Sequence, residues 1–328
     1  HASHVTMSVI KLMSRIVAPG SSEINNDQKL HPKSQRGASI TKTDDEEAAA
    51  TKPISSRSSS LPAQFQRSKS DDSLDIAAAT MHDHTYGITS DPMVRFACAL
   101  SALIHDVDHC GVPNAQLVKE QTPAAQVYDG RSVAEQNSLV LAWELFMSDE
   151  YATLRSCVCP TASEARRLRQ LVVNAVMATD IVDKDLKKAR NERWDRAFNS
   201  DALRQSENDV TNQKATIVIE HLMQASDVAH TMQHWHIYRK WNELFFKECH
   251  AAYKAGRSQS NPIDTWYKSE IGFFDYYIIP LAKKLKECGV FGKSSDEYLN
   301  YALANRAEWE RRGEEIVAEM AKEVAGTA

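Results

Sequence analysis

An apolar segment of this chain ends in four ionisable side chains within five consecutive positions. The apolar run is Phe96–Leu103, and one residue later comes the sequence His105-Asp106-Val107-Asp108-His109. On a helix, His105 and His109 would share one face, and Asp106 would point about 100° away from His105. Buried charge is costly unless it is paired, and a divalent metal is a suitable partner for His and Asp together. The pattern therefore favours a metal site over an N-terminal capping cluster with satisfied core histidines.

Length and charge restrict the class of protein. The chain has 328 residues, of which 42% are hydrophobic and 25% charged, and its net charge is −5. A chain of this size can bury one large core or two modest ones. The mild, dispersed acidity argues against nucleic acid as a partner.

The cysteines and the hydropathy pattern predict where the protein works. Six cysteines occur without CxxC spacing, which indicates free thiols in a reducing compartment, and we expect a cytoplasmic location. No run of 18 apolar residues occurs, so no direct membrane contact is expected from this segment. The first residue is His1 rather than Met. We therefore expect a fragment or processed chain, whose parent could be membrane-tethered.

Composition divides the chain into unequal parts. Residues 1–17 have apolar residues at helical spacing. Residues 18–85 are rich in Ser and poor in apolar residues, which predicts a disordered insertion within a single domain. Within it, Ser60 and Ser70 each follow an Arg by three residues, as kinases and phosphoserine adaptors prefer; a merely solvated linker is the alternative.

Helical patterns dominate the remainder and predict an all-α fold. Asp91-Pro92 is a suitable helix start, with a capping residue followed by Pro in the first turn. Further helices are predicted at 134–147, 163–179, 209–255 with a break near 230–236, 265–286 and 296–322. No segment alternates convincingly between apolar and polar residues, as a half-buried strand would.

Two further segments contain candidate site residues. Asp227 interrupts an apolar row that includes Ile219 and Met223, so it is either a structural hydrogen-bonding group or a further metal ligand. Residues 268–281 concentrate aromatic side chains beside Glu270 and Gly272. They could line a slot for a flat heterocycle, or they could simply be core.

These motifs together resemble class I cyclic nucleotide phosphodiesterases, which belong to the HD hydrolase superfamily. The resemblance rests on ordered blocks, namely His105 to His109, Gly111-Val112-Pro113-Asn114, Ala178-Thr179-Asp180, Ala225-Ser226-Asp227 and Ser269-Glu270-Ile271-Gly272-Phe273-Phe274-Asp275 with Pro280-Leu281. His1-Ala2-Ser3-His4-Val5 is similar to the end of the family motif Tyr-His-Asn-x-x-His-Ala. The resemblance implies one compact multi-helix catalytic domain over residues 1–328, truncated at its N-terminus.

The resemblance also implies a site with two divalent metals, zinc and magnesium or manganese. Carried over by position, the ligands of the first metal are His1, His105, Asp106 and Asp227, and Asp106 bridges to the second metal. His109, Glu135 and Thr179 would hold the waters on the second metal, and His109 and Glu135 are the expected catalytic residues of this chain. The family's general acid, the His of Tyr-His-Asn, would lie upstream of His1.

The expected substrate is a 3',5'-cyclic nucleotide, opened to the 5'-monophosphate in second-messenger signalling. Phe273 would stack on the purine, and His230 stands where the family often has a base-contacting Asn. Glu270 replaces the family's purine-holding Gln. Because an ionised Glu only accepts hydrogen bonds and guanine offers two donors on one edge, we expect a preference for cGMP over cAMP.

Three alternatives remain open from the residues. The chain could be another HD-type phosphohydrolase, such as a nucleotidase or a dNTP hydrolase. It could be a catalytically impaired cyclic-nucleotide-binding module, or a helical interaction domain with incidental histidines.

Overall fold

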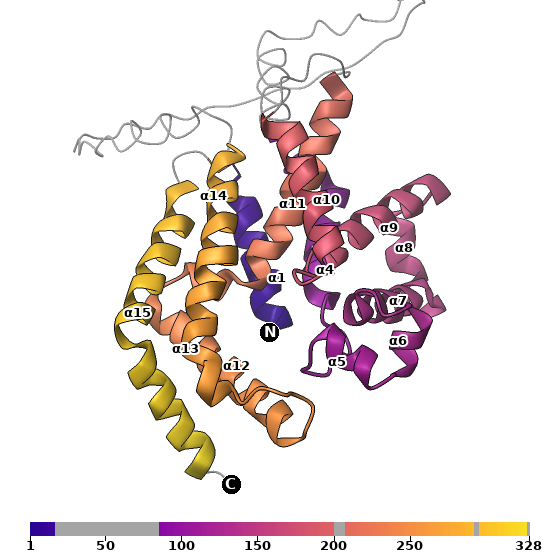
Figure 1. The fold of residues 1–328 in the computed structure, drawn as a ribbon. Coiled ribbons are helices and arrows are strands. Elements are labelled where there is room, and N and C mark those ends of the chain that lie inside the picture. The colour runs from indigo at the N-terminus through magenta and orange to yellow at the C-terminus, as the bar shows by residue number, and fades with distance from the viewer. Residues whose placement is uncertain (17–84, 200–206, 292–294, 327–328) are drawn as a thin grey trace, which may run out of the picture. The chain divides into compact units, whose positions relative to one another are not determined.

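The computed structural model describes residues 1–16, 85–199, 207–291 and 295–326 (Figure 1). All the regular elements in these ranges are helices, and the predicted all-α class is confirmed. The predicted insertion at 18–85 lies outside the described residues apart from Thr85, and so do Ser60 and Ser70.

The first half of the described chain consists of helices of at most 16 residues, several of them short. Its elements are α1 (Ala2–Ser14), α4 (Pro92–Ile104), α5 (Asn114–Lys119), α6 (Pro123–Val127), α7 (Val133–Met147), the 3₁₀ turn η1 (Asp149–Tyr151), α8 (Ala152–Val158) and α9 (Ala162–Met177). The second half contains the longest helices. They are α10 (Lys184–Trp194), the π turn η2 (Asp195–Asn199), α11 (Glu207–Asp227), the 3₁₀ turn η3 (Ala229–Met232), α12 (Trp235–Lys254), α13 (Pro262–Phe273), the π turn η4 (Phe274–Ile278), α14 (Ile279–Glu287) and α15 (Ser295–Gly326).

Local sequence explains where α4 begins. The Asp91 side chain accepts hydrogen bonds from the backbone N–H groups of Met93 and Val94, and Pro92 occupies the first helical position. Asp satisfies backbone donors that a helix start leaves free, and Pro has no donor to lose there. The start predicted at Asp91-Pro92 is therefore confirmed.

Two other predictions concern whether long helical stretches are interrupted. The stretch 209–255 was expected to break near 230–236, and α11 indeed ends at Asp227 while α12 begins at Trp235. The stretch 265–286 remains helical throughout, but the π turn η4 separates α13 from α14. The sequence reading missed α5, α6, α8 and α10, which are short or strongly polar.

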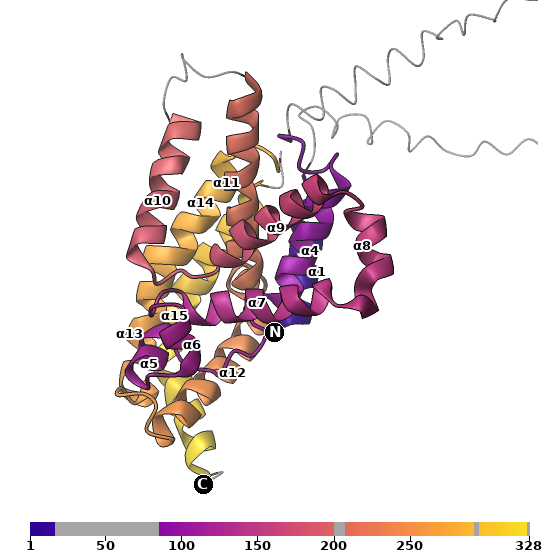
Figure 2. The same cartoon turned by 90° about the vertical axis from the view of Figure 1, so that its right-hand side faces the viewer.

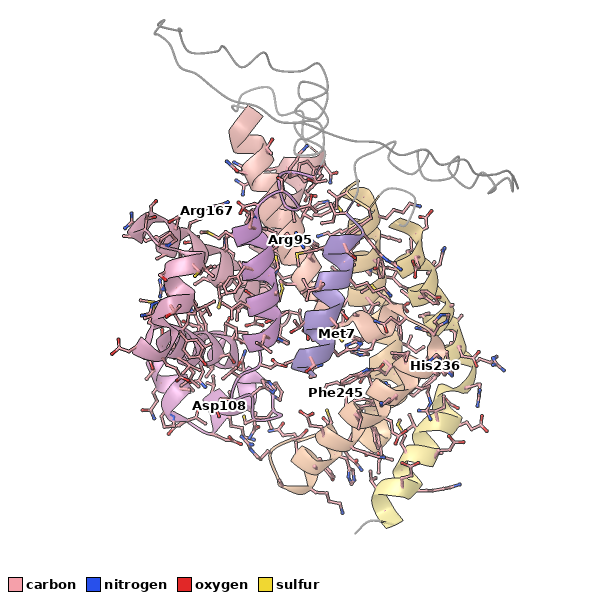
Figure 3. All side chains as sticks on the ribbon, turned by 180° about the vertical axis from the view of Figure 1, so that it is seen from behind. Met7, Arg95, Asp108, Arg167, His236 and Phe245 are labelled. Atoms are coloured by element: carbon pink, nitrogen blue, oxygen red, sulfur yellow. The ribbon has the colours of Figure 1, made fainter. Side chains whose placement is uncertain are left out.

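Helix α1 is held against the rest of the fold by its apolar face. Val5 and Val9 are fully buried, and α1 packs against both α4 and α11. In Figure 3, α1, marked by the exposed Met7, lies beside α4, marked by Arg95. The largest of the hydrophobic clusters in the described ranges joins α1 to α11 and to the C-terminal helices, with Met223, Phe274 and Trp309 completely buried. This core fixes where the ends of α1, α4 and α11 meet.

Candidate functional site

Three helix termini bring the four predicted metal ligands together. His1 precedes α1, His105 and Asp106 follow α4, and Asp227 ends α11. The His1 Nε2 atom lies 2.8 Å from Asp227 Oδ1 and 3.8 Å from Asp106 Oδ2. The His105 Nε2 atom lies 3.3 Å from Asp106 Oδ2 and 3.4 Å from Asp227 Oδ1. We refer to these four residues as the ligand cluster.

The tautomer of His105 gives the ligand cluster its chemical character. The ring is 2% exposed, and its Nδ1 lies 3.0 Å from the carbonyl oxygen of Ala102. Because a carbonyl only accepts, Nδ1 must donate, and the neutral ring then has a lone pair on Nε2. That Nε2 is buried and makes no hydrogen bond within the described part of the chain. It faces carboxylate oxygens, so acceptors meet acceptors.

A cation resolves this conflict. Burial lowers the pKa of His105, but the carboxylates of Asp106 and Asp227 outweigh it and raise the pKa to about 10. A divalent metal can take the place of that proton, since two imidazoles and two carboxylates form a donor set that zinc and similar ions bind. The ligand atoms of His1, His105 and Asp106 all lie within 4.8 Å of one another. The residues present therefore fit a metal.

The residues predicted to hold metal-bound waters lie on the neighbouring helices. Glu135, in the first turn of α7, accepts a 2.9 Å hydrogen bond from Asn114 Nδ2. Burial raises the pKa of the Glu135 carboxyl, against the opposing effect of the Asn114 hydrogen bond. His109 is exposed, and its Nδ1 accepts from the backbone N–H of Gly111 at 3.2 Å. Gly111 has a φ of +71°, so the loop uses a conformation that glycine adopts freely.

Thr179 is held by a local hydrogen bond of its own. Its Oγ1 donates to the carbonyl oxygen of Val176 at 2.7 Å, at the end of α9. The adjacent Asp180 is buried, and its Oδ2 accepts from Ser132 Oγ at 2.6 Å. Within the described residues, no hydrogen bond joins Thr179 to His109 or Glu135.

Glu270 is at the end of a directed chain of hydrogen bonds. The Trp266 indole N–H donates to Asn242 Oδ1 at 3.3 Å, and Asn242 Nδ2 donates to the Tyr238 hydroxyl at 3.4 Å. The indole can only donate, so the Tyr238 proton is left to donate to Glu270 Oε2 at 2.7 Å. Glu270 is 8% exposed. Burial raises its pKa to about 7, although the Tyr238 and Asn242 contacts lower it.

The other two predicted substrate residues are positioned by ring contacts. Phe273 is partly buried and stacks on Tyr277, with ring centroids 5.4 Å apart and an interplanar angle of 19°. His230 lies in η3, and its Nδ1 is buried without a hydrogen-bond partner among the described residues. Burial lowers the pKa of His230 to about 4. No hydrogen bond or ring contact joins His230 to Glu270 or Phe273 in the described ranges.

Sequence reasoning missed two supports of the site. Trp241, from α12, packs its ring against His1, His4 and His230, at centroid distances of 5.9, 4.9 and 6.1 Å. Asn114 was noticed as part of a motif without a role, yet its Oδ1 also accepts from the Ala134 N–H at 2.9 Å and so ties α5 to α7. The spacing of Asn114 before an apolar helix start offered a weak signal, and Trp241 offered none.

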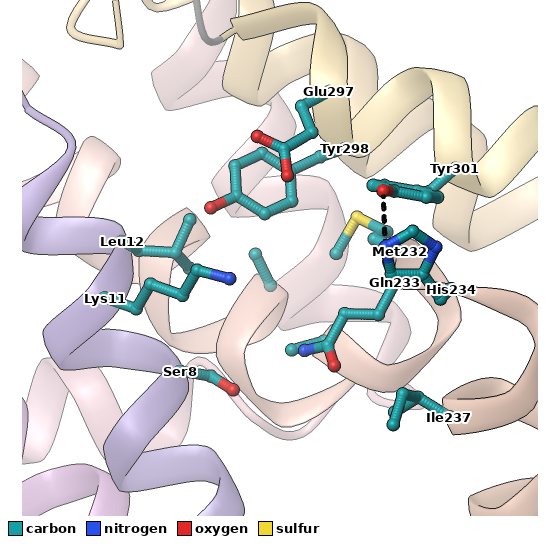
Figure 4. Close-up of a pocket in the computed structure, with 12 residues that line it drawn as sticks. Ser8, Lys11, Leu12, Met232, Gln233, His234, Ile237, Glu297, Tyr298 and Tyr301 are labelled. Atoms are coloured by element: carbon teal, nitrogen blue, oxygen red, sulfur yellow. Dashed lines mark hydrogen bonds between the residues drawn. The ribbon is translucent and has the colours of Figure 1, made fainter.

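A cavity of about 130 Å³ lies between α1, η3, α12 and α15, and none of the predicted site residues lines it (Figure 4). Lys11 and Glu297 both line it, and the Tyr301 hydroxyl lies 3.0 Å from His234 Nε2. Glu297 also accepts a 2.5 Å hydrogen bond from Arg15. Opposite charges are therefore already present at this cavity.

A family model described as 3'5'-cyclic nucleotide phosphodiesterase matches residues 72–298, more than half of the chain. The chain belongs to this family. Phosphodiesterases of the family depend on divalent metals. The matched range contains His105, Asp106 and Asp227, whereas His1 precedes it.

The chain is also similar to individual phosphodiesterases. It is 29% identical over 157 residues to the dual specificity calcium/calmodulin-dependent 3',5'-cyclic nucleotide phosphodiesterase 1 of Drosophila melanogaster, covering 47% of this chain and 17% of that protein. It is 28% identical over 193 residues to the mouse enzyme 1C of the same description, covering 56% of this chain and 25% of that protein. The matched part is thus a quarter or less of the length of either relative.

Among solved structures, the phosphodiesterase domain of the Salpingoeca rosetta rhodopsin phosphodiesterase has the same fold. The two structures superpose with a TM-score of 0.56 and 22% identity, covering 75% of this chain and 76% of that one. In the described part of this phosphodiesterase-family chain, no helix has the length and apolarity needed to cross a membrane.

Proposed function

We propose that this chain is a metal-dependent phosphodiesterase that hydrolyses 3',5'-cyclic nucleotides to 5'-monophosphates in second-messenger signalling. One observation carries the proposal. The buried, unpartnered Nε2 of His105 faces the carboxylates of Asp106 and Asp227 inside the range that matches the family. Such an arrangement is stabilised by a cation and is costly without one.

The ligand cluster would hold the first of two divalent ions, zinc, with Asp106 shared with a second, magnesium or manganese. Bound ions would supply a hydroxide nucleophile at neutral pH and neutralise charge on the phosphoryl oxygens. His105 is suited to holding an ion because the Ala102 carbonyl orients its ring and sets its tautomer. His1 is oriented by its contact with Trp241 and by the carboxylate of Asp227.

His109, Glu135 and Thr179 would orient water on the second ion. Glu135 is suited to this because Asn114 fixes one of its oxygens and burial favours its protonated form, so it can exchange a proton with water. His109 is exposed and accepts only from the Gly111 N–H in the described structure, which leaves its other ring nitrogen for substrate or water.

Nucleotide recognition would rest on Phe273, Glu270 and His230. Phe273, supported by the parallel ring of Tyr277, offers a flat apolar face for a purine. When Glu270 is ionised it accepts the two donors on the edge of guanine, which favours cGMP. When it is protonated it can also donate, as an amide does, and the preference weakens. The relatives named above are described as dual specificity, which fits a site that admits both purines.

The setting of the enzyme is part of the same proposal. All six cysteines are free thiols in the structure, which supports a reducing compartment such as the cytoplasm. Phosphorylation at Ser60 or Ser70 would regulate the enzyme by adding charge.

The test is to incubate the protein with cAMP or cGMP in the presence of Zn²⁺ and Mg²⁺ and to measure product formation by chromatography. We expect 5'-monophosphates, and we expect their formation to stop when a chelator is added and to resume when metal is restored. Nucleotide binding without product would indicate the impaired binding module instead. Hydrolysis of other nucleotides, but not of cyclic ones, would indicate a different HD-type phosphohydrolase.

A further inference from the structure

A small cavity of about 70 Å³ lies between α10, α11 and the segment formed by η4 and α14. Figure 2 shows α10, α11 and α14 running alongside one another, as their packing contacts require. We call this cavity the basic pocket because Lys187, Arg190 and Lys284 line it, together with His221 and Tyr277, and none of its lining residues is acidic. Burial lowers the pKa of His221 to about 4, so this residue adds no charge near neutral pH.

The cations of the basic pocket are bound to neutral oxygens. Arg190 is 6% exposed and donates to the carbonyl oxygens of Asp180 at 2.8 Å and Met177 at 3.4 Å. Lys284 Nζ donates to Asn191 Oδ1 at 2.8 Å. In the described part of the chain, neither cation forms an ion pair within 4.0 Å. A buried charge such as that of Arg190 is usually paired. Because no acid lines the pocket, it has an excess of positive charge.

Nearby acidic groups do not cancel this excess. Burial lowers the pKa of the Lys284 ammonium, and the carboxylates of Asp195 and Glu287 oppose this effect. The positive charges of Arg190 and Lys187 lower the pKa further, and the net shift is downward. Glu220 and Asp180 also act on the charge of Arg190, but both carboxylates have other donors. Both Glu220 oxygens accept from Arg193 at 2.7 Å, and Asp180 accepts from Ser132 and from backbone N–H groups. The cations therefore repel one another across the pocket.

A hydroxyl in the same pocket also lacks a partner. The Tyr277 Oη atom is buried and makes no hydrogen bond within the described ranges. A phenolic hydroxyl can both donate and accept, and the Tyr277 proton has no acceptor among the described residues. An anion in the pocket would supply that acceptor and would screen the lysines and Arg190 at the same time.

Residues of the basic pocket contact the surroundings of two predicted site residues, Thr179 and Phe273. Arg190 holds the Met177 and Asp180 carbonyls, and Gln224, which also lines the pocket, donates to the Ala178 carbonyl at 3.0 Å. These three carbonyls surround Thr179. On the other side, Tyr277 supports the ring of Phe273.

We propose that the basic pocket binds a phosphate-type oxyanion through Lys187, Arg190, Lys284 and the Tyr277 hydroxyl. The volume admits one tetrahedral oxyanion in place of a few waters. The source is either inorganic phosphate or the phosphate group of a nucleoside monophosphate. In the second case the nucleoside part would extend out of the pocket past the exposed Tyr276. The bound anion would affect catalysis through the backbone on either side of Thr179, and this effect rests on the proposed function. Binding of the anion is independent of the proposed function.

The test is calorimetric titration of inorganic phosphate into chelator-treated protein at constant ionic strength. Removing metals prevents phosphate from binding at the ligand cluster, so the result is independent of hydrolysis. We expect saturable binding that weakens about tenfold or more in the double variant Lys187→Gln/Lys284→Gln, since each lysine contributes a charge-assisted contact. Lys284→Arg preserves the charge and should retain binding.

The matched control is Lys188→Gln/Lys283→Gln, which removes the same charge from exposed neighbours that do not line the pocket. Thermal melts followed by circular dichroism verify that each variant is folded. The same titration with adenosine and guanosine 5'-monophosphates distinguishes the two sources: tighter binding than inorganic phosphate through the same lysines indicates a nucleotide. Absence of saturable binding, or equal weakening in both double variants, would overturn the proposal.

Discussion

The ligand cluster and the basic pocket lie near the same end of α11 and have opposite polarity. In the ligand cluster, Nε2 of His105 faces the carboxylates of Asp106 and Asp227, so without a proton or a metal between them acceptors meet acceptors. In the basic pocket, Arg190, Lys284 and the Tyr277 hydroxyl are all donors, and no acid lines the cavity. The kind of polar group left unpaired thus indicates the sign of the missing ligand, a cation in one place and an anion in the other.

The cavity of Figure 4 shows what a neutralised pocket looks like in the same molecule. Lys11 lines it, but so does Glu297, which Arg15 already binds. Neither positive nor negative charge is in excess at this cavity, so we assign no ion to it. Glu270 represents a further case, because burial raises the pKa of its carboxyl to about 7 and a proton can then neutralise its charge in place of a cation.

The largest expected effect comes from removing a carboxylate of the ligand cluster. In Asp227→Asn, cyclic nucleotide hydrolysis should fall by more than about 100-fold and the metal content should fall with it, since even residues that only support metal ligands are worth up to that factor. Chromatography of products and elemental analysis of purified protein measure both. Asp149→Asn changes an exposed acid of η1 and should leave both unchanged. Full activity in Asp227→Asn would show that the ligand cluster does not need a cation.

The next effect concerns the donor that Glu270 requires. Tyr238→Phe removes the hydroxyl that donates to Glu270 Oε2, and the free energy of unfolding should fall by about 1–3 kcal/mol because a buried acceptor loses its partner. The pKa of Glu270 should rise further. Denaturant unfolding measures the stability. The control is Tyr253→Phe on the same helix, whose hydroxyl makes no hydrogen bond within the described residues, so its loss should cost little.

A pH titration of nucleotide preference tests whether a proton stands in for a cation at Glu270. As the pH rises through about 7, Glu270 ionises and loses its donor, so the cGMP to cAMP ratio of kcat/KM should rise by about tenfold, the value of one charge-assisted hydrogen bond. In Glu270→Gln the ratio should favour cAMP more and should no longer change with pH. A flat ratio in the unchanged protein would contradict this role.

The smallest effect comes from placing a negative charge beside the basic pocket. Asn191→Asp keeps the oxygen that Lys284 binds and adds a carboxylate, which should raise the free energy of unfolding by about 0.5–1 kcal/mol at low salt. Phosphate binding should weaken in parallel, because the pocket then contains its own anion. In the control Asn174→Asp, the oxygen accepts from the neutral Gln170 amide, and no gain is expected. Destabilisation by Asn191→Asp would show that the pocket has no excess of positive charge.

Much of the fold was predictable because its signals are local. The capping of α4 by Asp91, the break after Asp227 and the long amphipathic stretches follow from neighbouring residues, and the structure confirms them. Helix α10 escaped prediction because few of its residues are apolar, and its buried face combines Trp194 with the charged Arg190. Its helical state depends on packing against α11 rather than on an apolar pattern.

By itself, the sequence determined the all-α class and drew attention to His105, Asp106 and Asp227, because charged groups that end or interrupt an apolar run are visible without coordinates. His1 entered the predicted ligand set only through the resemblance to the family. The tertiary structure decided two things. It brought His1 within 2.8 Å of Asp227, across 226 residues. It also gathered Lys187, Arg190, Lys284 and Tyr277 from separate helices into one pocket without an acid. Such arrangements depend on how helices pack, and packing is set by the whole core rather than by any stretch of neighbouring residues.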